Sequence, residues 1–220
     1  PNLLERHFKT NQPNRKWVTD VTEFKVNDQK LYLSPILDLF NGEVVSYNLS
    51  RHPNFKQITD MLEGAFQKLP NKVDNLILHS DQGWQYQMKS YQNLLKAKGI
   101  TQSMSRKATC LDNAVAENFF GLLKTELFYL EKFDSIDQLE KAIVDYIDYY
   151  NNRRIKLKLN GLSPVQYRIQ TVGAALIQFL SNFWGSFQDC RTVSFAYNRF
   201  SPVEFCTVSS CPVRLDTSAR

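Results

Sequence analysis

Long apolar segments are missing from this sequence. No uninterrupted apolar run in the 220 residues reaches the ~20 that a membrane-spanning helix needs. The longest candidate, 172–187, is interrupted by Gln178, Ser181, Asn182 and Gly185. The first six residues lack the basic-then-apolar order of a signal peptide. We therefore expect no membrane partner, and the missing initiator methionine leads us to expect a fragment of a longer protein.

Cysteine and histidine are also scarce. The chain has 4 Cys and 3 His, with no Cys-x-x-Cys pair and no His near the cysteines at its end. These spacings fit neither a zinc ribbon nor a mixed His/Cys zinc site. Only Cys110 lies in the first 170 residues, which is typical of a reducing compartment. We interpret the cysteines as structural or incidental.

Lysine is absent from the last 50 residues, although 16 Lys occur in the first 170. Three of the four cysteines lie in this Lys-free part. The change indicates two compositions joined near residue 171. We predict that 171–220 is an atypical, poorly ordered tail, frame-shifted or read through from another coding sequence. The alternative is an added helix over 174–184 that packs against a partner segment.

The first 170 residues have the patterns of a globular α/β domain. Strands are expected at 17–26, 29–40 and 43–49, with Asn41-Gly42 as a two-residue hairpin turn. Helical spacing of apolar residues then alternates with two short strands, at 75–80 and 100–104. The expected helices are 55–69, 87–98, 114–129 and 135–151, followed by a short one that starts at Pro164. This order predicts a mixed five-stranded sheet, three antiparallel strands first, with helices on both faces.

Three carboxylates occupy informative positions in this pattern. Asp20 lies in the middle of the first expected strand, where an unpaired carboxylate is costly to bury. Asp81 directly follows the strand 75–80, and ligand sites gather at such strand ends. Glu117 lies in the first turns of a helix. Taken singly, Asp81 could be a turn residue and Glu117 an acid that stabilises a helix N-terminus.

These carboxylates can meet if the first and fourth strands are neighbours in the sheet. Both aspartates then project from one sheet edge, and the helix after strand five can bring Glu117 over the same place. Hard oxygen ligands of this kind suit Mg²⁺ or Mn²⁺, and we expect two ions. Two such ions serve phosphodiester chemistry by activating the attacking oxygen and stabilising the leaving one.

Five sequence blocks carry a resemblance to a known family. WVTDVTEF, HSDQGWQY and DNAVAENFFGLLKTE, with 35 residues between Asp81 and Glu117, are followed by YYNNRRIK and GLSPVQY. Over residues 1–170 the sequence resembles bacterial insertion-sequence transposases of the IS-three family, which are DDE recombinases with a retroviral-integrase-like core. The resemblance implies an RNase H-like fold and metal-dependent DNA cleavage and strand transfer. It also implies that Asp20, Asp81 and Glu117 are the catalytic, metal-binding triad.

The resemblance also assigns residues around the triad. Lys124 matches a basic residue that contacts the element's DNA end, whereas Gly121 replaces a lysine of the integrase pattern. The other expected DNA contacts are Arg106, Lys107, Arg153, Arg154 and Lys156. The residues expected to support the active-site loops are His79, Gln82, Gly83 and Asn113.

The resemblance finally implies the partners and the setting. The partners are the element's ends and target DNA, bound by a homo-oligomer in the bacterial cytoplasm and, through DNA, at the nucleoid. We expect 1–15 to lead in from an upstream DNA-binding region and 16–170 to form the catalytic core. Two alternatives stay open: an RNase H-like nuclease without strand transfer, and an inactive remnant that only binds DNA.

Overall fold

We describe the protein from a computed structural model. It describes residues 2–5, 7–69, 73, 75–106 and 113–184, and the side chains of the last helix only as far as residue 174. The chain divides into two compact units, Pro1–Phe179 and Leu180–Arg220, of which the first holds the fold presented below. Among the described residues, no helix is both long enough and apolar enough to cross a bilayer.

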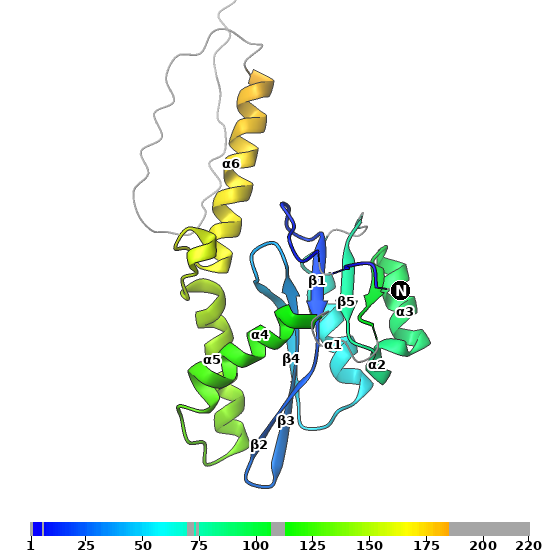
Figure 1. Cartoon of the computed structure of the whole chain (residues 1–220), viewed down its shortest axis with the longest axis vertical. Helices are drawn as coiled ribbons and strands as arrows, with labels where there is room; N and C mark the ends of the chain where they lie inside the picture. Colours follow the sequence, from blue (N-terminus) through cyan, green and yellow to red (C-terminus); the bar gives the residue numbers. More distant parts are fainter. Residues whose placement is uncertain (1, 6, 70–72, 74, 107–112, 185–220) are drawn as a thin grey trace, which may run out of the picture. The chain divides into compact units, whose positions relative to one another are not determined.

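A mixed sheet forms the centre of the first unit. Its strands are β1 (Lys16–Thr19), β2 (Thr22–Val26), β3 (Gln29–Asp38), β4 (Val44–Ser50), β5 (Ile77–Ser80) and β6 (Thr101–Met104). They follow the order β2-β3-β1-β5-β6, with β4 paired to β3. The pairs among β1 to β4 are antiparallel, while β1–β5 and β5–β6 are parallel. The first and fourth strands of the sequence prediction, β1 and β5, are therefore neighbours, as they lie in Figure 1.

The prediction of one unbroken strand over 17–26 is wrong, because Asp20 lies between β1 and β2 rather than mid-strand. Both pieces pair with β3 in one continuous register, Thr19 with Ile36 and Thr22 with Leu33. That register sets Asp20 opposite Pro35, which has no N–H to donate to the ladder. The Val21 N–H instead donates to the Asp20 carboxylate, 2.8 Å away. Counted as one interrupted strand, β1 and β2 give the five-stranded sheet that the sequence predicts.

The turn between β3 and β4 is longer than the predicted two residues. Asp38 N–H donates to the Glu43 carbonyl at 2.9 Å, and Gly42 N–H donates to the Asp38 carbonyl at 2.7 Å. These bonds enclose a four-residue loop, 39–42. Gly42 has φ +70°, a left-handed conformation that glycine adopts without steric cost.

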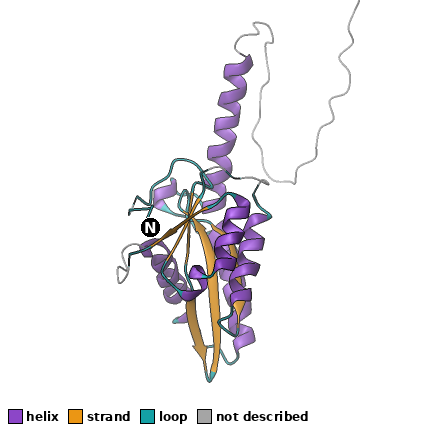
Figure 2. Cartoon of the chain, turned by 90° about the vertical axis from the view of Figure 1, so that its right-hand side faces the viewer, coloured by secondary structure: helices purple, strands orange, loops and turns teal. Residues whose placement is uncertain are grey.

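Helices cover both faces of the sheet, as predicted (Figures 1 and 2). One face carries α1 (Phe55–Phe66), α2 (Trp84–Gln87) and α3 (Lys89–Lys98), and the other carries α4 (Ala114–Leu123) and α5 (Ile136–Asn152). A π-helical turn, η2 (Lys124–Phe128), extends α4, and a 3₁₀ turn, η3 (Leu157–Leu159), precedes α6 (Pro164–Trp184). The two faces bury separate apolar clusters, one around Phe119 and Ile143 and one around Met61 and Leu95.

Capping contacts lie at three of the predicted helix ends, whereas the first helix stops at Phe66 instead of residue 69 and the second is divided into α2 and α3. The side chains of Asn54 and Ser135 accept N–H groups three residues later, at 2.9 Å and 3.2 Å. Gly99 ends α3 with φ +76°. Asp112 and Asn113 both precede α4 and are residue types that cap helices, but the Asn113 side chain makes no capping bond and instead donates to the Thr19 carbonyl at 3.5 Å. The alternative cap, Asp112, lies outside the described residues.

The last helix is longer than the sequence prediction of a short one. It starts at Pro164, as predicted, and its 21 residues continue past position 170 to Trp184. The predicted boundary at 170 thus falls within a helix. The tail beyond Trp184 lies outside the described residues, so its origin and order remain predictions.

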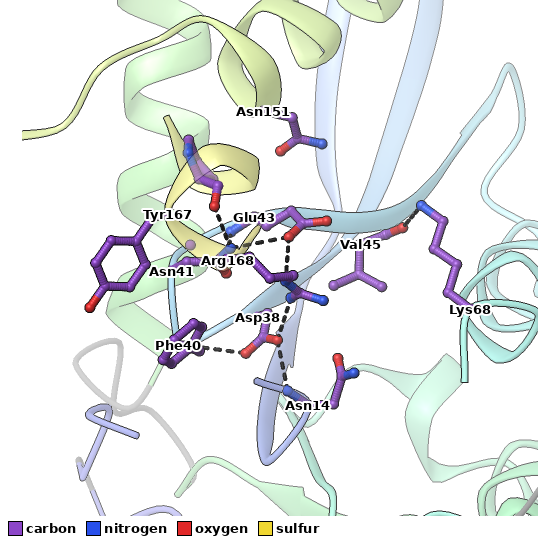
Figure 3. A network of polar contacts seen from close by, with 12 residues as sticks. Asn14, Asp38, Phe40, Asn41, Glu43, Val45, Lys68, Asn151, Tyr167 and Arg168 are labelled. Carbon is purple, nitrogen blue, oxygen red and sulfur yellow. Dashed lines mark hydrogen bonds and ion pairs between the residues drawn. The ribbon is translucent and has the colours of Figure 1, made fainter. Parts of the chain in front are cut away.

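Buried ionic contacts attach the start of α6 to the β3–β4 turn (Figure 3). Arg168 lies 2.6 Å from the Asp38 carboxylate and 2.7 Å from that of Glu43. Asp38 is fully buried and also accepts the backbone N–H groups of Asn14 and Phe40, both at 2.9 Å. Arg168 directly follows the GLSPVQY block, and the Pro164 carbonyl within that block accepts a hydrogen bond from the Asn41 side chain at 2.8 Å, so this segment contributes to the fold of the sheet domain.

Candidate active site

The two predicted aspartates follow neighbouring parallel strands at the same level. Val18 of β1 pairs with His79 of β5. Continued past this pair, the same register sets Asp20 level with Asp81. Adjacent strands lie about 4.8 Å apart, so both carboxyl groups are at one place on the carboxyl edge of the sheet.

Glu117 reaches this place from the helix α4, which packs against β1. It lies in the first turn of the helix, while Phe119 and Phe120 on the same helix are buried. The Glu117 side chain itself is exposed, and its charge acts on the Asp20 carboxylate together with that of Asp81. Two of the three predicted carboxylates, Asp81 and Glu117, therefore act electrostatically on the third, Asp20.

Asp20 is the most perturbed acid of the three. Its pKa is raised from 3.8 to about 7, mainly by burial, and the nearby charges of Asp81 and Glu117 contribute to this rise. The hydrogen bond from the Val21 N–H opposes the rise, as does a contact with the Asn113 side chain. A site that makes a carboxylate costly to ionise is one in which a bound cation would be favourable.

The donor set fits a hard divalent cation. Three carboxylates supply the oxygen ligands that Mg²⁺ and Mn²⁺ prefer. One oxygen of Asp20 accepts the Val21 N–H, and one oxygen of Asp81 accepts the Gly83 N–H at 2.9 Å, so both carboxylates are held by their own loops. Within the described part of the chain, however, no three His, Cys, Asp or Glu side chains are grouped closely enough to hold a metal ion.

The predicted loop residues make contacts close to the two aspartates in the sequence. His79 is buried in β5, and its Nδ1 lies 2.8 Å from the Ser103 hydroxyl on β6. Gln82 donates to the Ser105 carbonyl at 3.0 Å, which ties the Asp81 loop to the end of β6. Gly83 donates to Asp81, and Asn113 donates to the Thr19 carbonyl next to Asp20. These contacts link the loops that carry the acids.

The predicted DNA contacts differ in how exposed their side chains are and in the residues that they contact. Arg153 and Arg106 are exposed, although Arg153 also lies 3.5 Å from Asp148. Lys124 lies over the ring of Phe24, with 5.6 Å between its Nζ and the ring centroid. Lys107 lies outside the described residues.

Arg154 and Lys156 have structural partners, which the sequence did not indicate. Arg154 makes a two-pronged ion pair with Glu126, with its Nε 2.9 Å from one carboxylate oxygen and its guanidinium NH₂ 2.5 Å from the other. Lys156 donates to the Tyr150 hydroxyl at 2.8 Å and to the Gly42 carbonyl at 3.3 Å. The pKa of Lys156 is lowered to about 8, mainly by burial and to a smaller extent by the charge of Arg154. These contacts favour a structural role over phosphate binding for both.

Two neighbours of the acids were missed in the sequence. Tyr86, on the short helix α2, is fully buried and feels the charges of Asp20 and Asp81, which add to the burial that raises its pKa. Its only sequence signal is a position five residues after Asp81, since a four-residue helix has no readable periodicity. Asn118 is exposed next to Glu117, and an isolated exposed amide gives no signal at all.

Comparisons with known proteins agree with this geometry. Two models of the integrase core domain match residues 10–110 and 117–172. The chain is 58% identical over 171 residues to a transposase-like protein of Haemophilus influenzae, covering 78% of this chain and 78% of that protein. The chain belongs to the IS3 family of DDE transposases.

Other members of the IS3 family are longer than this chain. The InsK transposase for the element IS150 of Escherichia coli is 61% identical over 171 residues, which are 78% of this chain and 60% of that protein. InsF of the element IS3fB from the same organism is 35% identical over 172 residues, 78% of this chain and 59% of that protein. The chain thus spans about 60% of the length of these two relatives.

Solved structures confirm the predicted RNase H-like fold. The catalytic core of HTLV-2 integrase, solved in complex with magnesium in a trimeric form, is 20% identical with a TM-score of 0.56. The similarity covers 71% of this chain and 97% of that one. A simian T-cell lymphotropic virus intasome in complex with a PP2A regulatory subunit gives a TM-score of 0.57 at 20% identity, covering 67% of this chain and 52% of that chain.

The buried carboxyl of Asp20 predicts a pH-dependent stability of the metal-free protein. A carboxyl with a raised folded-state pKa is destabilising once ionised, so stability falls as the pH rises from about 4 to about 7. We expect Asp20→Asn to raise the free energy of unfolding at pH 8 by about 2 kcal/mol, below the limit of about 4 kcal/mol set by the pKa difference. Chemical denaturation in EDTA at pH 4 and pH 8 measures this.

The matched control is Asp28→Asn, at an exposed position in the β2–β3 turn. We expect Asp28→Asn to leave the difference in the free energy of unfolding between pH 4 and pH 8 the same as in the wild type. An Asp20→Asn variant that is equally stabilised at both pH values would contradict the assigned burial of the charge.

Proposed function

We propose that this chain is the catalytic core of a transposase that cleaves DNA and joins the resulting 3′-hydroxyl to another phosphodiester. The observation that carries the proposal is the shared level of Asp20 and Asp81 on β1 and β5, with the charge of Glu117 acting on Asp20. Membership of the IS3 family supports it, since its members are polynucleotidyl transferases. The residues proposed as the triad are those that sequence spacing selected.

In this proposal Asp20, Asp81 and Glu117 hold Mg²⁺ or Mn²⁺. Such ions, when bound, polarise a phosphodiester and lower the pKa of bound water. The chain's own part is to keep three carboxylates at one sheet edge. The loop bonds from Val21 and Gly83 fix the two aspartates, and the helix α4 sets the approach of Glu117.

The partners in this proposal are DNA and further copies of the chain. The ends of the insertion sequence and the target DNA are the substrates, and in a homo-oligomer each copy would bring one active site. A cytoplasmic protein that associates with the nucleoid when bound to DNA fits these substrates. Residues 1–15 would then follow a DNA-binding region that recognises the ends.

Metal removal tests the proposal. Labelled duplexes carrying the element's ends should be nicked and joined to a supercoiled plasmid in Mg²⁺ or Mn²⁺, and both products should disappear in EDTA. Product lengths on denaturing gels and plasmid relaxation measure the two steps. Nicking without joining would favour a nuclease, and binding without either product would favour an inactive remnant. Cleavage that survives EDTA would contradict the metal assignment.

A further inference from the structure

Two hollows of similar size lie on the helical face formed by α4 and α5, and they differ in charge. One, of about 730 Å³, is bordered by the acids Glu126, Glu131 and Asp145. The other, of about 600 Å³, is bordered by the bases Arg154, Lys156 and Lys158 and, among the described residues, by no acid. We call the second one the basic groove. Its other lining residues include Val115, Asn118, Leu122, Ile155 and Leu157.

Part of the lining of the basic groove comes from residues of α4 close to Glu117 in the sequence. Val115 and Asn118, on the helix α4, line it and flank Glu117 in the sequence. A DNA strand that leaves the carboxylates along this side of α4 would enter the groove directly. The acidic hollow instead lies at Thr125 and beyond, past the end of α4.

The opposite wall of the groove exposes apolar side chains between cations. Leu157 is 94% exposed and Ile155 is 68% exposed, although both are large and apolar. Arg153 and Lys158 on either side of them are exposed as well. From residue 149 to residue 188 the sequence has no Asp or Glu. Alternating cations and apolar side chains match a nucleic acid strand, with phosphates for the cations and base faces for the apolar groups.

The segment that carries these side chains is held in place by contacts of Lys156 with Tyr150 and Leu162. Lys156, between Ile155 and Leu157, donates to the Tyr150 hydroxyl, and its Nζ lies 4.1 Å from that ring's centroid. The backbone groups of Lys156 and Leu162 pair across the loop at 3.0 Å. Anchoring Lys156 inward leaves its two neighbours directed outward, so the exposure of Ile155 and Leu157 follows from the fold.

We propose that the basic groove holds the DNA strand next to the reacting phosphodiester, with Leu157 and Ile155 against unpaired bases and Lys158 and Arg153 on phosphates. This rests on the proposed function and adds where the substrate lies. Charge favours DNA over a second copy of the chain, because every charged residue that lines the groove in the described part of the chain is basic. A second copy is kept as an outcome of the test.

Binding measured without catalysis tests the groove separately from the reaction. Fluorescence anisotropy in EDTA would follow a labelled duplex with an unpaired end, over a range of salt concentrations. We expect Lys158→Ala to weaken binding and to lower the slope of log affinity against log salt by about one. We expect Leu157→Ser to weaken binding about tenfold without changing that slope, and to affect a fully paired blunt duplex less.

Matched controls come from the acidic hollow. Leu130 is 76% exposed there and Lys132 is exposed beside it, so Leu130→Ser and Lys132→Ala should leave DNA binding unchanged. Equal effects of Leu157→Ser and Leu130→Ser would overturn the proposal, as would sedimentation showing that Leu157→Ser dissociates an oligomer. If the wild-type chain joins DNA while Leu157→Ser and Lys158→Ala bind it normally, the groove is refuted and the transposase function stands. A wild-type chain that binds through the groove without cleaving or joining refutes only the function.

Discussion

Asp20→Asn, Asp81→Asn and Glu117→Gln are each expected to lower the rate of DNA cleavage by about a thousandfold or more. Each substitution removes one negative charge while keeping the shape of the side chain. Metal-dependent stabilisation of a phosphodiester transition state contributes several kcal/mol, and every 1.36 kcal/mol is tenfold in rate. Gel-based rates of nicking and joining in Mg²⁺ measure the effect.

The three variants should differ in stability, which separates lost chemistry from lost folding. Asp20→Asn relieves a buried charge, so the metal-free protein should be more stable. Glu117 is exposed, so Glu117→Gln should change stability little. Mg²⁺ should stabilise the wild type against unfolding more than any of the variants. Loss of activity with unchanged Mg²⁺ stabilisation would contradict the role of that residue as a ligand.

Control substitutions at other exposed acids should keep full activity. Asp28 lies in the β2–β3 turn and Glu63 on α1, and both are exposed. Asp28→Asn and Glu63→Gln also remove one charge each from the chain. A loss similar to that of the triad variants would show that net charge, rather than the site, determines the rate.

The sequence signals for the candidate site are local. Asp81 ends a short apolar strand, and a strand followed by a polar turn can be read from the residues alone. A meander continued by alternating helices and strands has few allowed topologies, and the site requires one in which β1 and β5 are neighbours, as they are in the structure. The prediction placed Asp20 inside a strand, whereas the strand is interrupted there. The sequence around Asp20 does not indicate this interruption, because Pro35, which lies opposite Asp20, belongs to the partner strand.

The roles of the basic residues could not be read in the same way. Arg154 binds Glu126, 28 residues earlier, and Lys156 binds Gly42, 114 residues earlier. A sequence pattern shows that both are cations but not that distant groups engage them. Nothing in the sequence distinguishes the exposed Lys158 from Arg154 and Lys156, whose side chains bind distant groups. Only the tertiary structure distinguishes residues that hold the segment from residues that face solvent.

Arg168→Met is expected to destabilise the protein by about 3–4 kcal/mol, the largest effect on folding that we predict. Arg168 lies 2.6 Å from Asp38, which is fully buried, and also contacts Glu43 (Figure 3). Removing the guanidinium leaves a buried carboxylate without its cation, and such losses cost about 3–5 kcal/mol. Chemical denaturation at pH 7 measures the change.

Arg168→Lys should recover only part of this stability. A guanidinium reaches two carboxylates with a planar set of donors, whereas an ammonium acts as a single point charge. Fully recovered stability would show that charge alone, rather than the two-sided geometry, holds α6 to the β3–β4 turn.

The pH dependence of the Arg168→Met variant identifies the group responsible. Burial raises the pKa of Asp38, and the charge of Arg168 opposes that rise, so removing Arg168 raises this pKa further. A carboxyl with a raised folded-state pKa is destabilising when ionised, so the loss should shrink as the pH falls and Asp38 is protonated. Asp38→Asn combined with Arg168→Met should likewise lose less than the two single losses added together. A loss that is independent of pH and additive would place the effect of Arg168 in packing rather than in the ion pair.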